Sequence, residues 1–292
     1  METPEEAAKR NQKGALKALG LLGIVFGGCL LAMVTLGGVG LLLLGEDMLG
    51  GRTYAETWTP SLGCNVVGIA VRGEIGITSD CTDEGCYVTT ASDDIIEYLK
   101  TAREDDSIQA ILIDIDSPGG GPVASEEIAN AIKATSKPTV AWVRQYAASG
   151  AYWIASAADT IVASPNSDVG SIGVSMSYLD ATNANEQDGL TFNSLSTGRY
   201  KDTGSPDKPL TDDEKALLER DLYITHENFI AAIAENRGLS LEVVSELADG
   251  STMLGKMALD NGLIDTLGGQ EEAYGILRDA IGEEPEVCWG GL

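Results

Sequence analysis

The sequence is poor in several residue types, and each shortage excludes a class of function. It contains one histidine, His226, among 292 residues, so a Ser/His/Asp triad could be built only on that side chain. Basic residues are also scarce, because 19 Lys and Arg against 45 Asp and Glu give a formal net charge of −26. Nucleic-acid binding is therefore disfavoured, since phosphate contacts require clustered Lys and Arg. A solvated acidic surface accounts for the charge, and a salt-rich habitat would select the same surface.

The five cysteines lack the spacing of a metal site. No Cys-x-x-Cys pair occurs, and the one histidine is distant in sequence, which argues against zinc; we expect no metal and no cofactor. Cys81 and Cys86 bracket a short acidic loop and would form a disulfide in an oxidising compartment, but a reduced pair fits the sequence equally well. Cys29 lies in an apolar segment, and Cys64 and Cys288 have no obvious partner.

One long uncharged segment runs from residue 18 to residue 45. About 20 apolar residues suffice to cross a bilayer as a helix. The segment is longer than a signal-peptide core and is followed by no clean cleavage site, so we expect a retained anchor. Lys and Arg precede it and acidic residues follow it. By the positive-inside rule, residues 1–17 are a cytoplasmic tail of a single-pass cell-membrane protein, and the chain after the anchor is extracytoplasmic.

Beyond the anchor, residues 46–64 read as a linker and residues 65–292 as one domain. Apolar runs predict strands over residues 65–71, 108–115, 139–143 and 160–163. Helical spacing predicts helices over residues 92–103, 147–158, 241–248 and 270–281, a helix containing Ile128, and a long helix from a capping box at Thr211 and Glu214 through Asn236. Ser92 can cap the first of these helices. Strands that alternate with helices indicate an α/β fold with a mostly parallel sheet.

Two features of this domain could support acyl transfer, which needs a nucleophile, a base and a site for the developing oxyanion. Ser149 follows two small residues near the start of a predicted helix, which itself follows a buried strand, and its hydroxyl would be exposed there; an ordinary helix N-cap is the other interpretation. The three glycines after Ser117 and Pro118 follow another strand and could present N–H groups to an oxyanion. A plain tight turn is equally compatible with that spacing.

The base could be Lys201, which makes a histidine unnecessary. A lysine acts as a base only when neutral, and its ordinary pKa is about 10.4, so the amine would have to be desolvated. A surface lysine is the simpler interpretation of this residue in isolation. His226 shares one helix face with Leu222, Phe229 and Ile233, which favours a semi-buried structural histidine over a catalytic one.

The order of several motifs resembles the single-repeat form of the signal peptide peptidase A family, membrane-anchored Ser/Lys peptidases with a Clp protease/crotonase-like fold. The similar segments lie between residues 65 and 269. They are Asp116-Ser-Pro-Gly-Gly-Gly121, Ala147-Ala-Ser-Gly150 with Tyr152, Ala157-Ala-Asp159, Val169-Gly-Ser-Ile-Gly173, Lys201-Asp202 with Ser205-Pro206, and Gly255-x-x-Ala258 with Gly262-Leu-Ile-Asp265. The family usually has Asn at the position of Asp116 and often Gly at the position of Ala151.

The resemblance implies a role for each site residue. Ser149 would be the nucleophile and Lys201 the general base, Gly119 and Gly120 would donate N–H groups to the oxyanion, and Ser171 would orient the lysine. It also implies a homo-oligomeric ring, whose sites neighbouring subunits could complete, and a substrate among the apolar signal-peptide remnants left in the membrane. Two rival functions remain, a catalytically silent scaffold that binds membrane partners and an acyl-CoA-binding crotonase relative.

Overall fold

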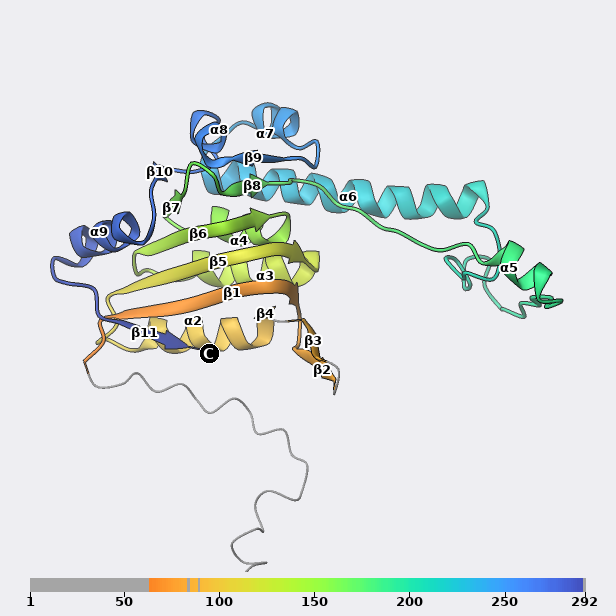
Figure 1. The fold of residues 1–292 in the computed structure, drawn as a ribbon, viewed down its shortest axis with the longest axis horizontal. Helices are drawn as coiled ribbons and strands as arrows, with labels where there is room; N and C mark the ends of the chain where they lie inside the picture. Colours follow the sequence, from red (N-terminus) through yellow and green to blue (C-terminus); the bar gives the residue numbers. More distant parts are fainter. Residues whose placement is uncertain (1–62, 83–84, 89, 291–292) are drawn as a thin grey trace, which may run out of the picture. The chain divides into compact units, whose positions relative to one another are not determined.

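The structure, a computed structural model, describes residues 63–82, 85–88 and 90–290 (Figure 1). The predicted tail, the anchor at residues 18–45 and nearly all of the linker lie outside these residues. Within the part of the chain that is described, no helix is long and apolar enough to cross a membrane.

The domain is built on a mostly parallel sheet, as the sequence predicts. The strand order is β10-β7-β6-β5-β1-β11, and each neighbouring pair is parallel. These strands are β1 (Val66–Gly76), β5 (Ala110–Gly120), β6 (Thr139–Ala148), β7 (Thr160–Ala163), β10 (Thr266–Leu267) and β11 (Val287–Gly290). Short strands extend the sheet at β4 (Thr90–Ala91), β8 (Asp168–Gly170) and β9 (Thr252–Leu254), and β2 (Asp80–Thr82) and β3 (Gly85–Val88) form a separate hairpin.

Helices cover both faces of the sheet (Figure 1). The helices α2 (Ser92–Glu104), α3 (Pro122–Lys133) and α4 (Gly150–Ser156) cover one face, and α9 (Gln270–Ile281) covers part of the other. Strand β5 needs a continuous run of apolar residues because its alternate side chains point to opposite faces of the sheet and both faces are covered by helices. Ile111 and Ile113 belong to the larger cluster, whereas Leu112 packs in the smaller cluster with Leu277 of α9.

A long helix, α6 (Asp212–Arg237), links this core to an exposed segment. Its N-terminus has the predicted capping box, and Gly238 ends it in a left-handed conformation. The C-terminal half packs on the core, where Phe229 stacks on Trp153 with ring centroids 4.7 Å apart. The shorter helices α7 (Leu241–Leu247) and α8 (Gly255–Asp260) follow α6.

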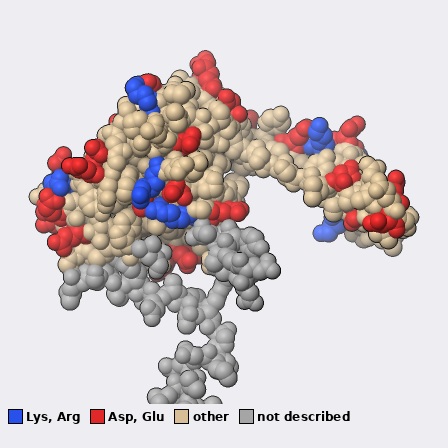
Figure 2. All heavy atoms as spheres, viewed as in Figure 1, with Lys and Arg blue, Asp and Glu red and all other residues tan. Residues whose placement is uncertain are grey.

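We call residues 174–211 the arm. The arm contains α5 (Thr182–Gln187) and extends along the N-terminal half of α6, away from the sheet (Figure 1). Every one of its residues is at least partly exposed. Figure 2 shows acidic side chains spread over the visible face and the end of the arm rather than gathered in one patch.

Two local predictions were wrong because strand pairing and tertiary contacts override local signals. Ala147 and Ala148 end β6, where they pair with β8, so α4 begins only at Gly150. Ser92 does not cap α2; Ala91 is the N-cap residue, and the Ser92 hydroxyl donates to Glu127 at 2.8 Å.

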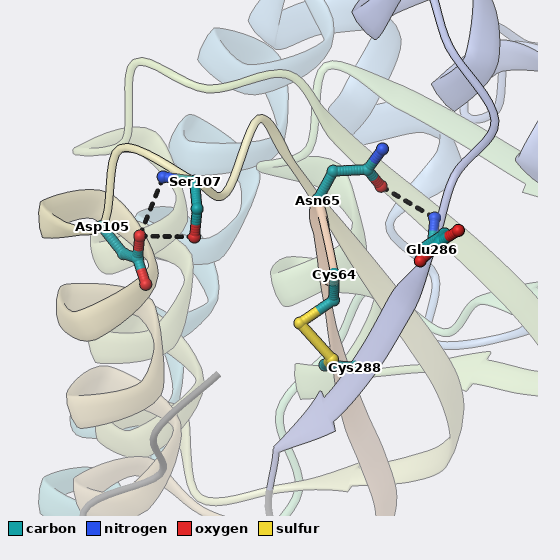
Figure 3. The surroundings of a disulfide bond; sticks show 6 residues. All are labelled: Cys64, Asn65, Asp105, Ser107, Glu286 and Cys288. Carbon is teal, nitrogen blue, oxygen red and sulfur yellow. Dashed lines mark hydrogen bonds between the residues drawn. A yellow bond between two sulfur atoms is a disulfide. The ribbon is translucent and has the colours of Figure 1, made fainter. Parts of the chain in front are cut away.

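The sequence gives no obvious partner for Cys64 or Cys288, and here too the structure corrects the expectation. These residues form a disulfide, with their Cα atoms 5.7 Å apart (Figure 3). Strand β11 lies parallel to β1 in the sheet, and this pairing brings together two cysteines that are 224 residues apart. Cys81 and Cys86 face each other in the backbone register of β2 and β3, but their side chains lie outside the description and their disulfide stays a prediction.

Candidate active site

Ser149 occupies a strained turn between β6 and α4. Its φ of 55° and ψ of −127° lie where residues other than glycine are rarely found, and such strain persists only where surrounding contacts hold it. The Ser149 N–H donates to Gly170 O at 2.7 Å, and its carbonyl accepts from Tyr152 N at 2.9 Å. A strained strand-to-helix turn of this kind is a known way to expose a nucleophilic hydroxyl.

The turn faces a cavity of about 540 Å³. Its wall includes Gly120 of the glycine loop (Gly119–Gly121), in which β5 ends, Ser171 and the residues that follow it, one face of α6 and residues 248–250. Trp153, Phe229 and Val174 give the wall an apolar part, beside the hydroxyl of Ser149. The cavity can therefore receive an apolar chain segment next to the serine.

The glycine loop packs too closely to tolerate side chains. Gly119 has a φ of 107°, and a Cβ there would lie 2.8 Å from the Ala148 carbonyl oxygen. A Cβ on Gly120 would lie 2.1 Å from the carbonyl oxygen of Ile75. Glycine is thus required for the loop to approach both β1 and the serine turn.

The N–H groups of this loop point in different directions. The Gly119 N–H donates to Ser117 Oγ at 3.1 Å, and the Gly121 N–H donates to Ile75 O of β1 at 2.8 Å. Successive N–H groups of an extended chain point to opposite sides, so the Gly120 N–H faces away from β1. It faces Gly150, where a Cβ would lie 3.4 Å from Gly120 N.

Gly120 and Gly150 together can donate to an oxyanion beside Ser149. Gly150 is the first residue of α4, so its N–H has no acceptor within the helix. Of the two predicted donors, Gly120 is placed for this role, whereas the Gly119 N–H is already engaged by Ser117. Sequence reasoning missed Gly150, although its place directly after a serine at a helix start was the available signal.

Ser171 lies in the same cavity and also has a positive φ, 52°. Its N–H donates to Ser251 O and its hydroxyl to Gly250 O, both at 2.9 Å. Nearby, Asp249 Oδ1 accepts from the N–H and the hydroxyl of Ser251, and these bonds lower the pKa of the Asp249 carboxyl. Asp249 therefore presents a fixed carboxylate at the cavity wall.

Lys201 is not brought to Ser149 within one chain. It lies in the arm and is exposed. Its neighbours tie the arm to the start of α6, through an ion pair of Arg199 with Asp213 and a 3.3 Å hydrogen bond from Thr203 to Glu214. The cavity meets α6 only from His226 onward, about 12 residues or about 18 Å further along the helix. That separation exceeds the reach of a lysine side chain.

His226 is half-buried, as the sequence predicts, but it lines the cavity that contains Ser149. Its Nε2 atom is buried and has no hydrogen-bond partner among the described residues. The part of the chain that the structure describes therefore forms no Ser/His/Asp hydrogen-bond relay. Within the described ranges, no group of three or more His, Cys, Asp or Glu side chains could hold a metal ion.

Comparisons with known proteins show the family to which the chain belongs. The model of the family described as "Peptidase family S49" matches residues 131–282, and the model described as "Clp protease" matches residues 84–170. A putative protease of Methanocaldococcus jannaschii is 33% identical over 249 residues, which cover 84% of this chain and 76% of the relative.

Two further relatives are longer than the matched region. The putative signal peptide peptidase SppA of Enterococcus faecium is 33% identical over 63% of this chain and 54% of its own length. Protease 4 of Haemophilus influenzae is 32% identical over 77% of this chain but only 35% of its own length. The Clp protease match supports the predicted Clp-like α/β fold, and the family match with these relatives shows that the chain belongs to peptidase family S49, the signal peptide peptidase A family.

Proposed function

We propose that this chain is a membrane-anchored serine endopeptidase with a Ser/Lys dyad, which cleaves apolar peptides such as signal-peptide remnants at the outer face of the cell membrane. One observation carries the proposal: Ser149, in a strained turn, lines the same cavity as Gly120. A structural N-cap serine does not require a positive φ, and the chain tolerates the cost of this one.

In the proposed reaction, Ser149 Oγ attacks the carbonyl carbon of the scissile peptide bond while the neutral amine of Lys201 accepts its proton. The resulting oxyanion accepts hydrogen bonds from the N–H groups of Gly120 and Gly150. When the tetrahedral intermediate collapses, the leaving amine takes the proton from Lys201. Lys201 then activates water, which hydrolyses the acyl-enzyme and regenerates the serine.

The base would come from a second copy of the chain in a homo-oligomeric ring. The arm that carries Lys201 exposes large apolar side chains, among them Leu179 (83%), Leu190 (60%) and Leu195 (101%). Exposed apolar groups concentrated on one segment favour a covered surface. A head-to-tail contact between subunits would cover the arm and deliver Lys201 to a neighbouring cavity, where Ser171 could orient its amine.

The substrate class follows from the cavity and the predicted anchor. The stacked rings of Trp153 and Phe229 favour apolar peptide side chains. An anchor at residues 18–45 would hold the cavity near the bilayer surface, where such peptides accumulate. The scaffold hypothesis does not explain the strained serine, and an acyl-CoA-binding enzyme would need no base in the position of Lys201.

The test uses the full chain in detergent with a fluorogenic apolar peptide and a fluorophosphonate probe that labels reactive serines. Wild type should cleave the peptide and be labelled at Ser149, whereas Ser149→Ala should do neither. Lys201→Arg should be inactive because arginine stays protonated, and Lys215→Arg, at an exposed site on α6, is its matched control.

Three outcomes would overturn the proposal in different ways. Undiminished cleavage by Ser149→Ala would eliminate the nucleophile. Wild-type turnover by Lys201→Arg would eliminate the base. A wild-type protein that neither cleaves nor reacts with the probe would favour the scaffold.

A further inference from the structure

We propose that Ser117 is a positioning residue for the oxyanion-binding loop and acts through the backbone of Gly119 and Gly120. The inference rests on the proposed function, since it assigns a role in the same reaction. The Ser117 side chain is fully buried and does not line the cavity. Any effect it has on catalysis must therefore pass through the groups that its hydroxyl contacts.

The Ser117 hydroxyl joins two strands at the point where their ladder is irregular. Its Oγ donates to Gly73 O of β1 at 2.5 Å and accepts from the Gly119 N–H at 3.1 Å. The register between β1 and β5 shifts between Arg72 and Glu74, which flank Gly73. The interrupted pairing of β1 and β5 leaves the Gly73 carbonyl and the Gly119 N–H without a backbone partner, and the Ser117 hydroxyl bonds to both. Backbone groups that are shielded from water require such partners.

This contact fixes the direction of the next N–H. With the Gly119 N–H held against Ser117 and the Gly121 N–H held by Ile75 of β1 at 2.8 Å, the loop is restrained on both sides of Gly120. Gly120 N is left close to Gly150, where a Cβ would lie 3.4 Å from it, beside the nucleophile Ser149. Without the hydroxyl, the buried N–H of Gly119 and the partly buried carbonyl of Gly73 would lose their partners, and the loop would relax to satisfy them.

Ser156 offers a matched control, because it is also fully buried and has the same hydrogen-bond inventory. Its hydroxyl donates to Trp153 O at 2.7 Å and accepts from Asn236 Nδ2 at 2.9 Å. Ser156 lies at the far end of α4 and does not line the cavity. Ser117→Ala and Ser156→Ala therefore remove equal numbers of buried hydrogen bonds, but only the first acts on the glycine loop.

The experiment measures kcat and KM of the full chain on a fluorogenic peptide, per serine titrated with a fluorophosphonate, and the Ki of a peptide aldehyde whose adduct carries the oxyanion. We expect Ser117→Ala to lower kcat about 10- to 100-fold, somewhat less than loss of a whole oxyanion donor, with KM changed less than about 3-fold. The aldehyde Ki should rise by a similar factor. Ser156→Ala should lose a similar amount of thermal stability but keep kcat within about 2-fold, because its loss is structural.

Normalisation by titrated serine removes the effect of a partly unfolded variant, and Ser117→Thr provides a second check. It keeps the hydroxyl and should retain more of kcat than Ser117→Ala even if the added methyl group lowers stability. The inference is overturned if Ser117→Ala keeps wild-type kcat per site, if Ser156→Ala loses kcat equally, or if Ser117→Thr is as slow as Ser117→Ala. Failure of the proposed function is recognised separately, by a wild-type enzyme that does not depend on Ser149.

Discussion

The serine turn and the arm differ in how their conformations are determined. The Ser149 N–H donates to Gly170 O of β8, the Ser149 carbonyl accepts from the N–H groups of Tyr152 and Trp153 in α4, and buried residues of the core surround this turn. Lys201 lies in a segment without a single buried residue, which contacts the start of α6 through Arg199, Thr203 and Lys208. Under the proposed function, one chain builds the nucleophile and the oxyanion donors in advance, whereas the base requires a surface from a second chain. The comparison would then explain how a chain carries both residues of the proposed dyad without bringing them together.

The sharpest way to probe this difference is to place the same substitution in both regions. Gly119 and Gly204 both have positive φ, 107° and 79°, but a Cβ at Gly204 meets nothing within 4 Å. We expect Gly119→Ala to lower the free energy of unfolding by at least about 3 kcal/mol, from strain and a backbone clash together. Its kcat should fall about 100-fold or more because the loop is displaced.

Gly204→Ala should lower the free energy of unfolding by only about 1 kcal/mol, which is the cost of placing a residue other than glycine in a left-handed conformation without a steric clash. Chemical denaturation and steady-state kinetics on both variants provide the measurement. Equal losses of stability at the two positions would contradict the view that the core fixes its glycine loop and the arm does not.

Acid should affect the arm at a predictable pH. Glu214 caps α6, and its pKa is lowered from 4.5 to about 2 by the hydrogen bond from Lys208 first and by the bond from the Thr211 N–H second. Because the pKa is lower in the folded state, the ionised carboxylate stabilises the fold at pH values above about 4.5. That stability is lost as the pH falls from about 4.5 towards about 2. We therefore expect the arm to become sensitive to pepsin over this range while the sheet stays protected.

Glu214→Gln should make the arm equally sensitive at pH 5 and pH 2, whereas Glu219→Gln, in an exposed pair with Lys215, should not. Limited proteolysis followed by mass spectrometry gives the cleavage sites. An arm that resists pepsin throughout this range would show that contacts other than the Glu214 cap hold it.

Local patterns in the sequence predict most of the elements but not their extent. The strand at residues 160–163 and the helix at residues 270–281 match the structure at both ends. Strand β5 continues through Gly120, although Pro118 and the glycines signal a turn. It continues because β1 pairs with it up to Ile75, and a partner strand distant in sequence leaves no local signal.

The candidate site was predictable in its residue types but not in its backbone. The resemblance identifies Ser149, Gly120 and Ser171, which share one cavity. It cannot show that Ser117 occupies the N–H of Gly119, because N–H directions depend on strand register. It also cannot place Lys201, which the structure leaves exposed in the arm, away from the cavity of Ser149.

The most direct test of the central claim mixes two inactive chains. Full-length Ser149→Ala and Lys201→Ala proteins, each without activity, are dissociated, combined in equal amounts and reassembled, and peptide cleavage is compared with that of wild type treated identically. If the base comes from a neighbouring copy, about a quarter of the sites in a head-to-tail ring regain both groups, so about a quarter of the wild-type rate should return. A mixture that stays inactive, although mixed oligomers form, would contradict a dyad shared between subunits.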